Sequence, residues 1–219
     1  MVVIVIAGPY RSGKSFLANR LLRQNKGFSV GSTTSACTKG IWMWNRLCPL
    51  APGKDAIVLD TEGLASAERT TNVDTKIFSL AILLSSIFVF NQIGPINENA
   101  LEELALVLKV AKTVRVRADG PEDAECKELA TLFPQFHWVL RDFFHRLDGR
   151  TPREYMEDAL REVPGLSEEV YKKNKIREAI KHFFTDRNCT ILIRPITDES
   201  KLAHVEDLPY EELKPEFRK

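Results

Sequence analysis

A glycine-flanked loop that ends in lysine and serine is the part of this sequence best suited to chemistry. Residues 8–15 read GPYRSGKS and fit the phosphate-binding pattern G-x-x-x-x-G-K-[ST]. Gly8 and Gly13 allow the backbone to turn several N–H groups into one concavity, and a following helix adds the positive end of its dipole. Lys14 is the expected partner of the β- and γ-phosphates, and the Ser15 hydroxyl the expected Mg²⁺ ligand. The alternative is a chance match in a glycine turn.

Arg11 occupies one of the variable positions of this loop, three residues before Lys14. A small residue would suffice there for wrapping phosphates. The arginine is therefore either a solvated surface charge or a catalytic charge carried by the loop itself. A guanidinium placed against a transferring phosphoryl group can raise the rate by roughly 10³–10⁵.

A second group of candidates surrounds the sequence VLDTEG, which closes an apolar strand. Asp60 at the end of that strand can hold Mg²⁺ through a water molecule, and Gly63 can present its N–H to a γ-phosphate. Thr38 lies in the polar segment 31–40, which predicts a flexible loop, and its hydroxyl and carbonyl could reach the metal and the γ-phosphate. The alternatives are an ordinary turn at the strand end and a solvated loop threonine.

The residues that would read a base are less evident, because the sequence N/T-K-x-D, commonly used to read guanine, is absent after the later strands. The strand HWVL is instead followed by Arg141 and Asp142. One carboxylate at a strand end can accept both the N1–H and the N2–H of guanine, whereas adenine offers no such pair of donors. A surface ion pair between these two residues is the alternative.

The elements that must position these candidates alternate between strand and helix. Val2–Ala7 is an uninterrupted apolar run and predicts a buried central strand, and residues 14–25 then show helical spacing. Further strands are predicted at 41–44, 56–60, 86–91, 137–142 and 190–195, and further helices at 97–114 and 174–184. A loop containing Pro49, Pro52 and Gly53 is expected between the strands at 41–44 and 56–60. The alternation predicts an α/β fold of the P-loop NTPase kind, with a mostly parallel central sheet flanked by helices.

Composition excludes several other classes of protein. The 219 residues include 31 basic and 30 acidic side chains, so the net charge of +1 gives no electrostatic case for binding nucleic acid or an anionic membrane. The four cysteines form no C-x-x-C pair, which favours reduced thiols and a cytoplasmic location and offers no metal-site pattern. The most apolar run, residues 77–90, is shorter than the roughly 20 residues that span a bilayer, and it predicts a helix followed by a strand.

With these residues in place, the sequence resembles the GTPase domain of the guanylate-binding proteins, in the dynamin superfamily. The similar pieces run over nearly the whole chain: GPYRSGKSFLANRLL, GFSVGSTTSACTKGIWMW, VLDTEG, FSLAILLSSIFVFNQIG, HWVLRDF and RPITDESKLAHVEDLPYEELKPEF. The pieces TKGIWMW and VLRDF together are specific. The piece REAIKHFFTDRNCTILIRP looks most like the plant and protist branch of the family.

The resemblance implies a large GTPase that binds GTP with Mg²⁺ and hydrolyses it to GDP, and in some members onward to GMP. It also implies a homodimer that forms through the GTPase domains when nucleotide is bound. Arg11 is then an internal arginine finger, which faces solvent until dimerisation presses the loop inward. Thr38 becomes the switch threonine, and Asp60 and Glu62 belong to the second switch.

The same resemblance assigns residues to three roles. The catalytic set is Arg11, Lys14, Thr38 and Glu62, and the metal set is Ser15, Thr38 and, through water, Asp60. Residues that contact the nucleotide are Gly8, Tyr10, Arg11, Ser12, Gly13, Lys14, Ser15, Phe16, Thr38, Asp60, Gly63, Arg141, Asp142, Arg194 and Pro195. Of these, Arg141 and Asp142 read the base, and Arg194 begins a cap over the guanine that runs to about Val205.

The resemblance implies domain boundaries, and this chain departs from the family pattern in two respects. Residues 1–200 form the GTPase domain, and 201–219 form its end and a connector toward a helical region absent from this chain, to which any membrane contact would belong. Ala36 stands where some animal members carry a serine that helps to place the attacking water, so a lower rate is expected.

Two other functions stay open at this stage. Membrane-remodelling GTPases of the atlastin type typically have glutamine where Glu62 stands. A nucleotide-dependent interaction module with little turnover is the other, and Ala36 is the residue that favours it.

Overall fold

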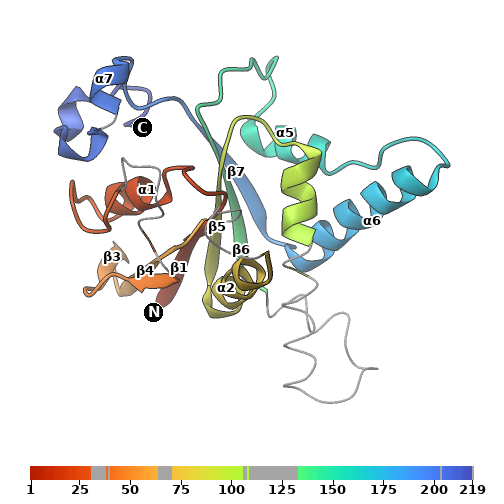
Figure 1. The fold of residues 1–219 in the computed structure, drawn as a ribbon, viewed down its shortest axis with the longest axis horizontal. Coiled ribbons are helices and arrows are strands. Elements are labelled where there is room, and N and C mark those ends of the chain that lie inside the picture. Colours follow the sequence, from red (N-terminus) through yellow and green to blue (C-terminus); the bar gives the residue numbers. More distant parts are fainter. Residues whose placement is uncertain are drawn as a thin grey trace.

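The computed structural model describes residues 1–30, 38, 40–63, 71–105, 108, 133–202 and 204–218, with the side chains of 71–74 left aside. A central sheet runs through the molecule, and helices cover both of its faces (Figure 1). The predicted α/β fold with a mostly parallel sheet is therefore confirmed. Ala36 and most of the predicted loop at 31–40 lie outside the described residues, as does most of the predicted helix 97–114 beyond residue 105.

The described residues form one seven-stranded sheet, in the order β2-β4-β1-β5-β6-β7, with β3 also paired to β4. The strands are β1 (Val2–Ala7), β2 (Ile41–Met43), β3 (Cys48–Ala51), β4 (Lys54–Thr61), β5 (Ile87–Ile93), β6 (Gln135–Arg141) and β7 (Arg187–Leu192). The five strands β4, β1, β5, β6 and β7 run parallel. Their carboxyl ends therefore meet at one edge, where open α/β sheets bind ligands.

The loop predicted between β2 and β4 is wrong in part, because Cys48–Ala51 forms β3, antiparallel to β4. Pro49 lies within this strand and is opposite Asp55. Proline lacks a backbone N–H and is tolerated on an edge strand, where no further ladder partner is required. Pro49, Pro52 and Gly53 predict a loop, but only Pro52 and Gly53 form the turn of the hairpin.

The described helices pack on both sides of the sheet. They are α1 (Lys14–Leu21), α2 (Thr71–Leu84), residues 98–105, α5 (Pro152–Ala159), α6 (Glu168–Phe183) and α7 (Glu199–Leu202), with short 3₁₀ helices η2 (Val205–Asp207) and η3 (Tyr210–Glu212). The apolar run at 77–90 divides into the end of α2 and the start of β5, as predicted. Within the described ranges, each helix is too short or too polar to cross a membrane.

Sequence reasoning overlooked α5, although its start carries a clear signal. Thr151 accepts the backbone N–H of Glu154 at 3.2 Å, and the Glu154 carboxylate accepts the N–H of Thr151 at 2.7 Å. This reciprocal capping box, with Pro152 in the first turn, is a sequence signature of a helix start.

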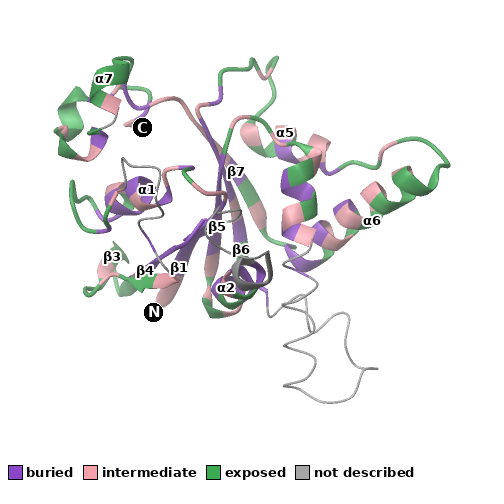
Figure 2. Cartoon of the chain, in the orientation of Figure 1, coloured by how far each residue is buried: buried purple, intermediate pink, exposed green. Residues whose placement is uncertain are grey.

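Two apolar clusters hold the helices to the sheet. Alternate residues of β1 divide between them, because successive strand side chains point to opposite faces. Ile4 and Ile6 pack with α1, whereas Val5 and Ala7 pack with the cluster that contains α2, residues 98–105, α5 and α6. Buried residues accordingly concentrate on the central strands (Figure 2).

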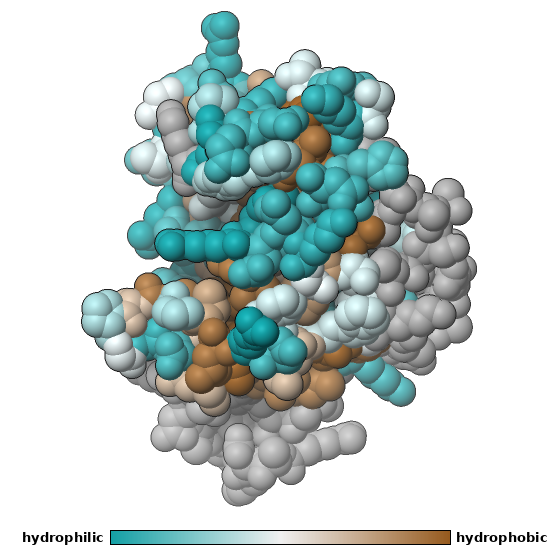
Figure 3. Space-filling view, turned by 90° about the vertical axis from the view of Figure 1, so that its left-hand side faces the viewer, coloured by the Kyte–Doolittle hydropathy of each residue, from teal (hydrophilic) through white to brown (hydrophobic). Residues whose placement is uncertain are grey.

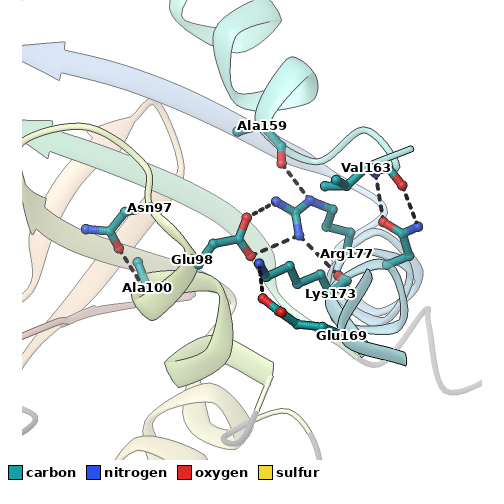
Figure 4. Close-up of polar contacts among 9 residues, drawn as sticks. Asn97, Glu98, Ala100, Ala159, Val163, Glu169, Lys173 and Arg177 are labelled. Carbon is teal, nitrogen blue, oxygen red and sulfur yellow. Dashed lines mark hydrogen bonds and ion pairs between the residues drawn. The ribbon is translucent and has the colours of Figure 1, made fainter. Parts of the chain in front are cut away.

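A buried arginine ties three helices together on the second of these faces. Arg177 of α6 is 5% exposed, and both of its terminal nitrogens donate to the Glu98 carboxylate, which begins the helix at 98–105. Its Nε donates to the carbonyl of Ala159 at the end of α5, at 3.2 Å, and Nη1 to the carbonyl of Lys173 (Figure 4). A bidentate arginine–carboxylate pair fixes both distance and angle, so Arg177 sets the spacing of these helices.

We predict that Arg177→Met lowers the free energy of unfolding by about 2 kcal/mol, because Glu98 and the Ala159 carbonyl lose a donor that only partial solvation replaces. Urea unfolding measures the loss. Lys175→Met is the matched control, since Lys175 pairs with Glu178 on the exposed side of the same helix, and its midpoint should scarcely move.

The pH dependence of this difference has a definite sign. The hydrogen bond from Arg177 holds the pKa of Glu98 below its ordinary value of 4.5. The stabilisation is therefore present above pH 4.5 and is lost as pH falls through the folded-state pKa. A stability difference between parent and variant that persists unchanged in acid would contradict the assignment.

Candidate functional site

The phosphate-binding pattern lies where the carboxyl end of β1 turns into α1. Gly13 caps the helix in a left-handed conformation, with φ of 80° and ψ of 30°, which a side chain would strain. A turn before it is closed by Ser12 N, which donates to the carbonyl of Pro9 at 3.4 Å. Arg11 stands at the tip of this turn with φ of 60°, and it is exposed. The loop therefore presents Arg11 outward and Lys14 inward.

Lys14 is buried beneath this loop. Its Nζ donates to the Pro9 carbonyl at 3.0 Å. Burial lowers the pKa of Lys14 to about 8, and the carboxylates of Asp60 and Glu62 oppose that fall. An anion placed against this amine would raise the pKa again, so the position favours a negatively charged ligand.

Three oxygen-bearing side chains from separate segments meet next to Lys14. Ser15 Oγ donates to Asp60 Oδ2 at 2.6 Å, Thr38 Oγ1 donates to the same oxygen at 3.0 Å, and the two hydroxyls lie 3.3 Å apart. Asp60 is fully buried, and burial raises its pKa against the opposing hydrogen bond from Ser15 and the charge of Lys14. Its second oxygen, Oδ1, is shielded from solvent and has no hydrogen-bond partner among the described residues. The predicted metal set is thus brought together around one carboxylate.

The residues after Asp60 pack closely against the phosphate loop. Glu62 is buried and exchanges two hydrogen bonds with Gly40: Glu62 Oε2 accepts the N–H of Gly40 at 2.9 Å, and Glu62 N donates to its carbonyl at 2.8 Å. A Cβ on Gly63 would lie 2.4 Å from Tyr10 Cα and 2.9 Å from Lys14 Nζ. Only glycine lets the chain approach the loop this closely.

The base-reading candidates lie at the carboxyl end of β6, two strands away from β1: Arg141 is its last residue and Asp142 follows it. Arg141 is 6% exposed, with Nη1 3.5 Å from the Gly13 carbonyl, and burial lowers its pKa. Asp142 adopts a left-handed conformation with φ of 52°, and its Oδ2 lies 3.6 Å from Nε of Arg194. Asp142 Oδ1 has no hydrogen-bond partner within the described ranges. The two residues are therefore not a surface pair, because Arg141 points inward to the loop.

The remaining predicted residues lie on either side of this pair. Phe16 is buried in the first turn of α1, beneath the guanidinium of Arg141, whose Cζ lies 5.7 Å from the ring centroid. Pro195 follows Arg194 after β7, and its carbonyl accepts the N–H of Lys214 at 2.8 Å. Gly8 directly follows β1 and lies beside the backbone of Asn91.

Sequence reasoning overlooked Asn91, which supports the loop from below. Asn91 is fully buried in β5, and its Nδ2 donates to Ser12 O at 2.7 Å and to Ser12 Oγ at 3.0 Å. It therefore fixes the residue that follows Arg11. The available signal was a polar residue near the end of an otherwise apolar strand, SIFVFN, whose carboxyl end must lie beside that of β1 in a parallel sheet.

Two other features lie apart from these residues. A cavity of about 720 Å³ opens at the β2–β3 side of the sheet, near the exposed Trp42, Met43 and Leu47. Apolar surface gathers at that level in Figure 3, below the hydrophilic surface over α7 and α1. His204, Glu206 and Asp207 form a cluster of possible metal ligands, but Lys26 pairs with Asp207 at 2.6 Å.

Comparison with known proteins decides the family. The family model "guanylate-binding protein, N-terminal domain" matches residues 1–219. The chain belongs to this family. The predicted resemblance is thereby confirmed, while its placement near the plant and protist branch stays a prediction.

Several curated relatives are similar over the whole chain. Guanylate-binding protein 7 of Mus musculus is 42% identical over 225 residues, which is 100% of this chain and 35% of that protein. Guanylate-binding protein 4 of Homo sapiens is 42% identical and covers 99% of the chain and 35% of its own length. Guanylate-binding protein 1 of Homo sapiens is 42% identical over 99% of this chain and 38% of its own length. The chain thus spans little more than a third of the family members it matches.

A solved structure of an Era variant from Aquifex aeolicus, bound to GDP and aluminium fluoride, covers 87% of this chain and 52% of its own. Its sequence identity is 14% and its TM-score 0.40, so this likeness is too weak to bear on function.

We predict that Gly63→Ala destabilises the protein by about 2 kcal/mol, because the new methyl group overlaps the Tyr10 backbone, which can move only with the whole loop. Gly53→Ala is the control: its Cβ meets nothing within 4 Å, and its φ of 72° costs only about 1 kcal/mol. Urea midpoints compare the two. Equal losses would show that the end of β4 does not press on the loop.

Proposed function

We propose that this chain binds a guanine nucleotide with Mg²⁺ and hydrolyses GTP to GDP. The observation that carries the proposal is the convergence of Ser15, Thr38 and Asp60 beside the buried amine of Lys14. Membership of a family whose members are named guanylate-binding proteins supports it. In this interpretation the charged side chains of Lys14 and Asp60 are buried because they bind the phosphates and the metal ion.

Mg²⁺ fits the oxygen cluster. Two hydroxyls and a carboxylate are the hard donors that this ion prefers, and it keeps several of its waters, so a carboxylate can act through water. The sheltered Oδ1 of Asp60, without a hydrogen-bond partner in the described part of the chain, also suits such a role. When bound, the ion would neutralise charge on the β- and γ-phosphates. Ser15 and Thr38 would hold it directly and Asp60 through water.

The phosphates would replace the Pro9 carbonyl as the partner of Lys14. Hydrolysis forms a bond between a water oxygen and the γ-phosphorus and breaks the bond to the β–γ bridging oxygen, and the proton of the water passes to phosphate. Negative charge develops on the bridging oxygen, and Arg11 is the side chain proposed to meet it. Thr38 and the buried Glu62, which is bonded to Gly40, are the groups available to hold the water.

The base end is proposed to select guanine. Asp142 Oδ1 and Oδ2 can accept the two adjacent donors of guanine once Arg194, now 3.6 Å away, gives up part of the carboxylate. Adenine bound in the same orientation would turn its unprotonated N1 and its C2–H toward the carboxylate and so offer it no N–H donor. Arg194 and Pro195 then begin the cap over the base.

Two further parts of the proposal concern pairing of two copies and the domain boundary. The exposed position of Arg11 fits a finger that is pressed inward when two copies pair through this domain. The boundary between the GTPase domain, 1–200, and a connector, 201–219, also stays a prediction.

We predict that the parent binds GDP at least about 100-fold more tightly than ADP, and that Asp142→Asn weakens GDP binding at least about tenfold, because half of the acceptor becomes a donor. Calorimetry with both nucleotides and Mg²⁺ measures this. Asp148→Asn is a matched control, since Asp148 is an exposed aspartate with φ of 50° outside the site, and it should bind as the parent does. Unchanged GDP affinity in Asp142→Asn would remove Asp142 from the base site.

We predict that Arg11→Ala leaves GTP affinity within a few-fold but lowers single-turnover hydrolysis by about 10³, and removes its dependence on protein concentration. The matched control is Arg23→Ala, because Arg23 is also an exposed arginine with a left-handed backbone, φ of 55°. Hydrolysis by Arg11→Ala at the parent rate, at concentrations that saturate the dimer, would exclude the internal finger. A parent that binds GTP without hydrolysing it would instead favour the interaction module.

A further inference from the structure

The buried guanidinium of Arg141 packs against two aromatic rings that come from opposite parts of the sequence and contact each other. Its Cζ is 5.7 Å from the ring centroid of Phe16 and 5.6 Å from that of Phe217. The two rings are 5.9 Å apart and tilted by 35°. Each distance is within the roughly 6 Å at which an arginine and an aromatic face attract one another.

Phe217 belongs to the C-terminal segment, residues 204–218, which folds back over α1 (Figure 1). Phe217 is 8% exposed and joins Val205, Leu213 and Phe16 in a small apolar cluster. The carbonyl of Pro195 anchors the segment through Lys214 N, at 2.8 Å. The segment therefore packs beside both ends of the proposed site, although it follows the last strand of the sheet.

Arg141 depends on these rings because polar contacts hold it only loosely. Its one hydrogen bond among the described residues, to the Gly13 carbonyl, is 3.5 Å long. Its Nε is shielded from solvent and finds no hydrogen-bond partner among the described residues. Burial disfavours its charge, and the nearby Asp142 carboxylate only partly opposes this. The rings of Phe16 and Phe217 thus form a joint apolar contact for the guanidinium, while its Nη1 approaches the Gly13 carbonyl of the phosphate loop.

We propose that Phe217 is a positioning residue that holds Arg141 against Gly13, so that the C-terminal segment forms part of the nucleotide site. This inference rests on the proposed function, and the ligand class is a nucleoside diphosphate or triphosphate. Because coupling between sites is reciprocal, nucleotide binding should also fasten the segment to α1. Residues expected to be a connector would then determine affinity.

The contact itself can be tested without nucleotide. The Nε–H signal of Arg141 is identified in NMR spectra by its loss in Arg141→Lys. Ring currents from Phe217 should displace that signal, so Phe217→Leu should move it and Phe217→Tyr should leave it close to the parent position. A signal that stays in place in Phe217→Leu overturns the inference.

The effect on the site is tested by GDP affinity with Mg²⁺. Phe217→Leu should weaken GDP about five- to tenfold, the scale of one cation–π contact away from water, and Phe217→Tyr should stay within about twofold. The control Phe183→Leu makes the same change at another phenylalanine that is 8% exposed. Phe183 belongs to the apolar cluster that contains α2, α5 and α6 rather than to the cluster of Phe217, so the GDP affinity of this variant should stay within about twofold of the parent.

The outcomes separate the two proposals. A parent that binds GDP, with Phe217→Leu equal to the parent or no weaker than Phe183→Leu, overturns the positioning role and leaves the proposed function standing. A parent that does not bind GDP overturns the proposed function and the affinity claim together.

Discussion

The constraint on which this structure depends is the burial of four charged side chains at the carboxyl edge of its sheet. Lys14, Asp60, Glu62 and Arg141 are each at most 6% exposed, and Asp60 Oδ1 and Arg141 Nε have no hydrogen-bond partner among the described residues. Arg177 is the fifth buried charge in the described part of the chain. It differs from the other four because both of its terminal nitrogens donate to the carboxylate of Glu98. A buried polar group without a partner costs about 1–3 kcal/mol, so the edge is held at some expense of stability. Charged groups buried in this way cluster at functional sites, which supports the proposed nucleotide site at this edge.

Parallel strands make this concentration of charge possible. In register, Ile6 of β1 is opposite Asp60 of β4, so the start of the loop and the carboxylate reach the edge together. On the other side, Gly94 after β5 donates its N–H to the carbonyl of Arg141 at 2.8 Å. The backbone ladder thus brings residues that are 54 and 47 positions apart in the sequence to the same edge of the sheet.

The sequence predicts those features whose contacts are made between residues close together in the chain. The loop, its helix and Asp60 were predictable, because strand, glycine turn and carboxylate each carry their signal within a few residues. β3 was not, because its pairing with β4 outweighs the prolines that suggest a loop. Asn91 and Phe217 act across 79 and 76 residues, on Ser12 and Arg141. The strand around Asn91 indicates only that its side chain lies near the sheet edge, and the sequence around Phe217 indicates no partner. Such roles depend on tertiary packing and emerge only from the folded chain.

Arg141 also joins the two ends of the proposed site through one peptide group. The carbonyl that its guanidinium approaches is that of Gly13, and the same carbonyl accepts the helical N–H of Leu17 at 3.0 Å. That carbonyl shares its peptide unit with the backbone N–H of Lys14, in the part of the loop proposed to face phosphate. Donors at the oxygen of a peptide draw electron density from its N–H and make it a stronger donor in turn, because hydrogen bonds in a chain polarise one another. At the proposed site, Arg141 would therefore strengthen phosphate binding without touching phosphate, and a shift of Phe217 would affect both ends of that site.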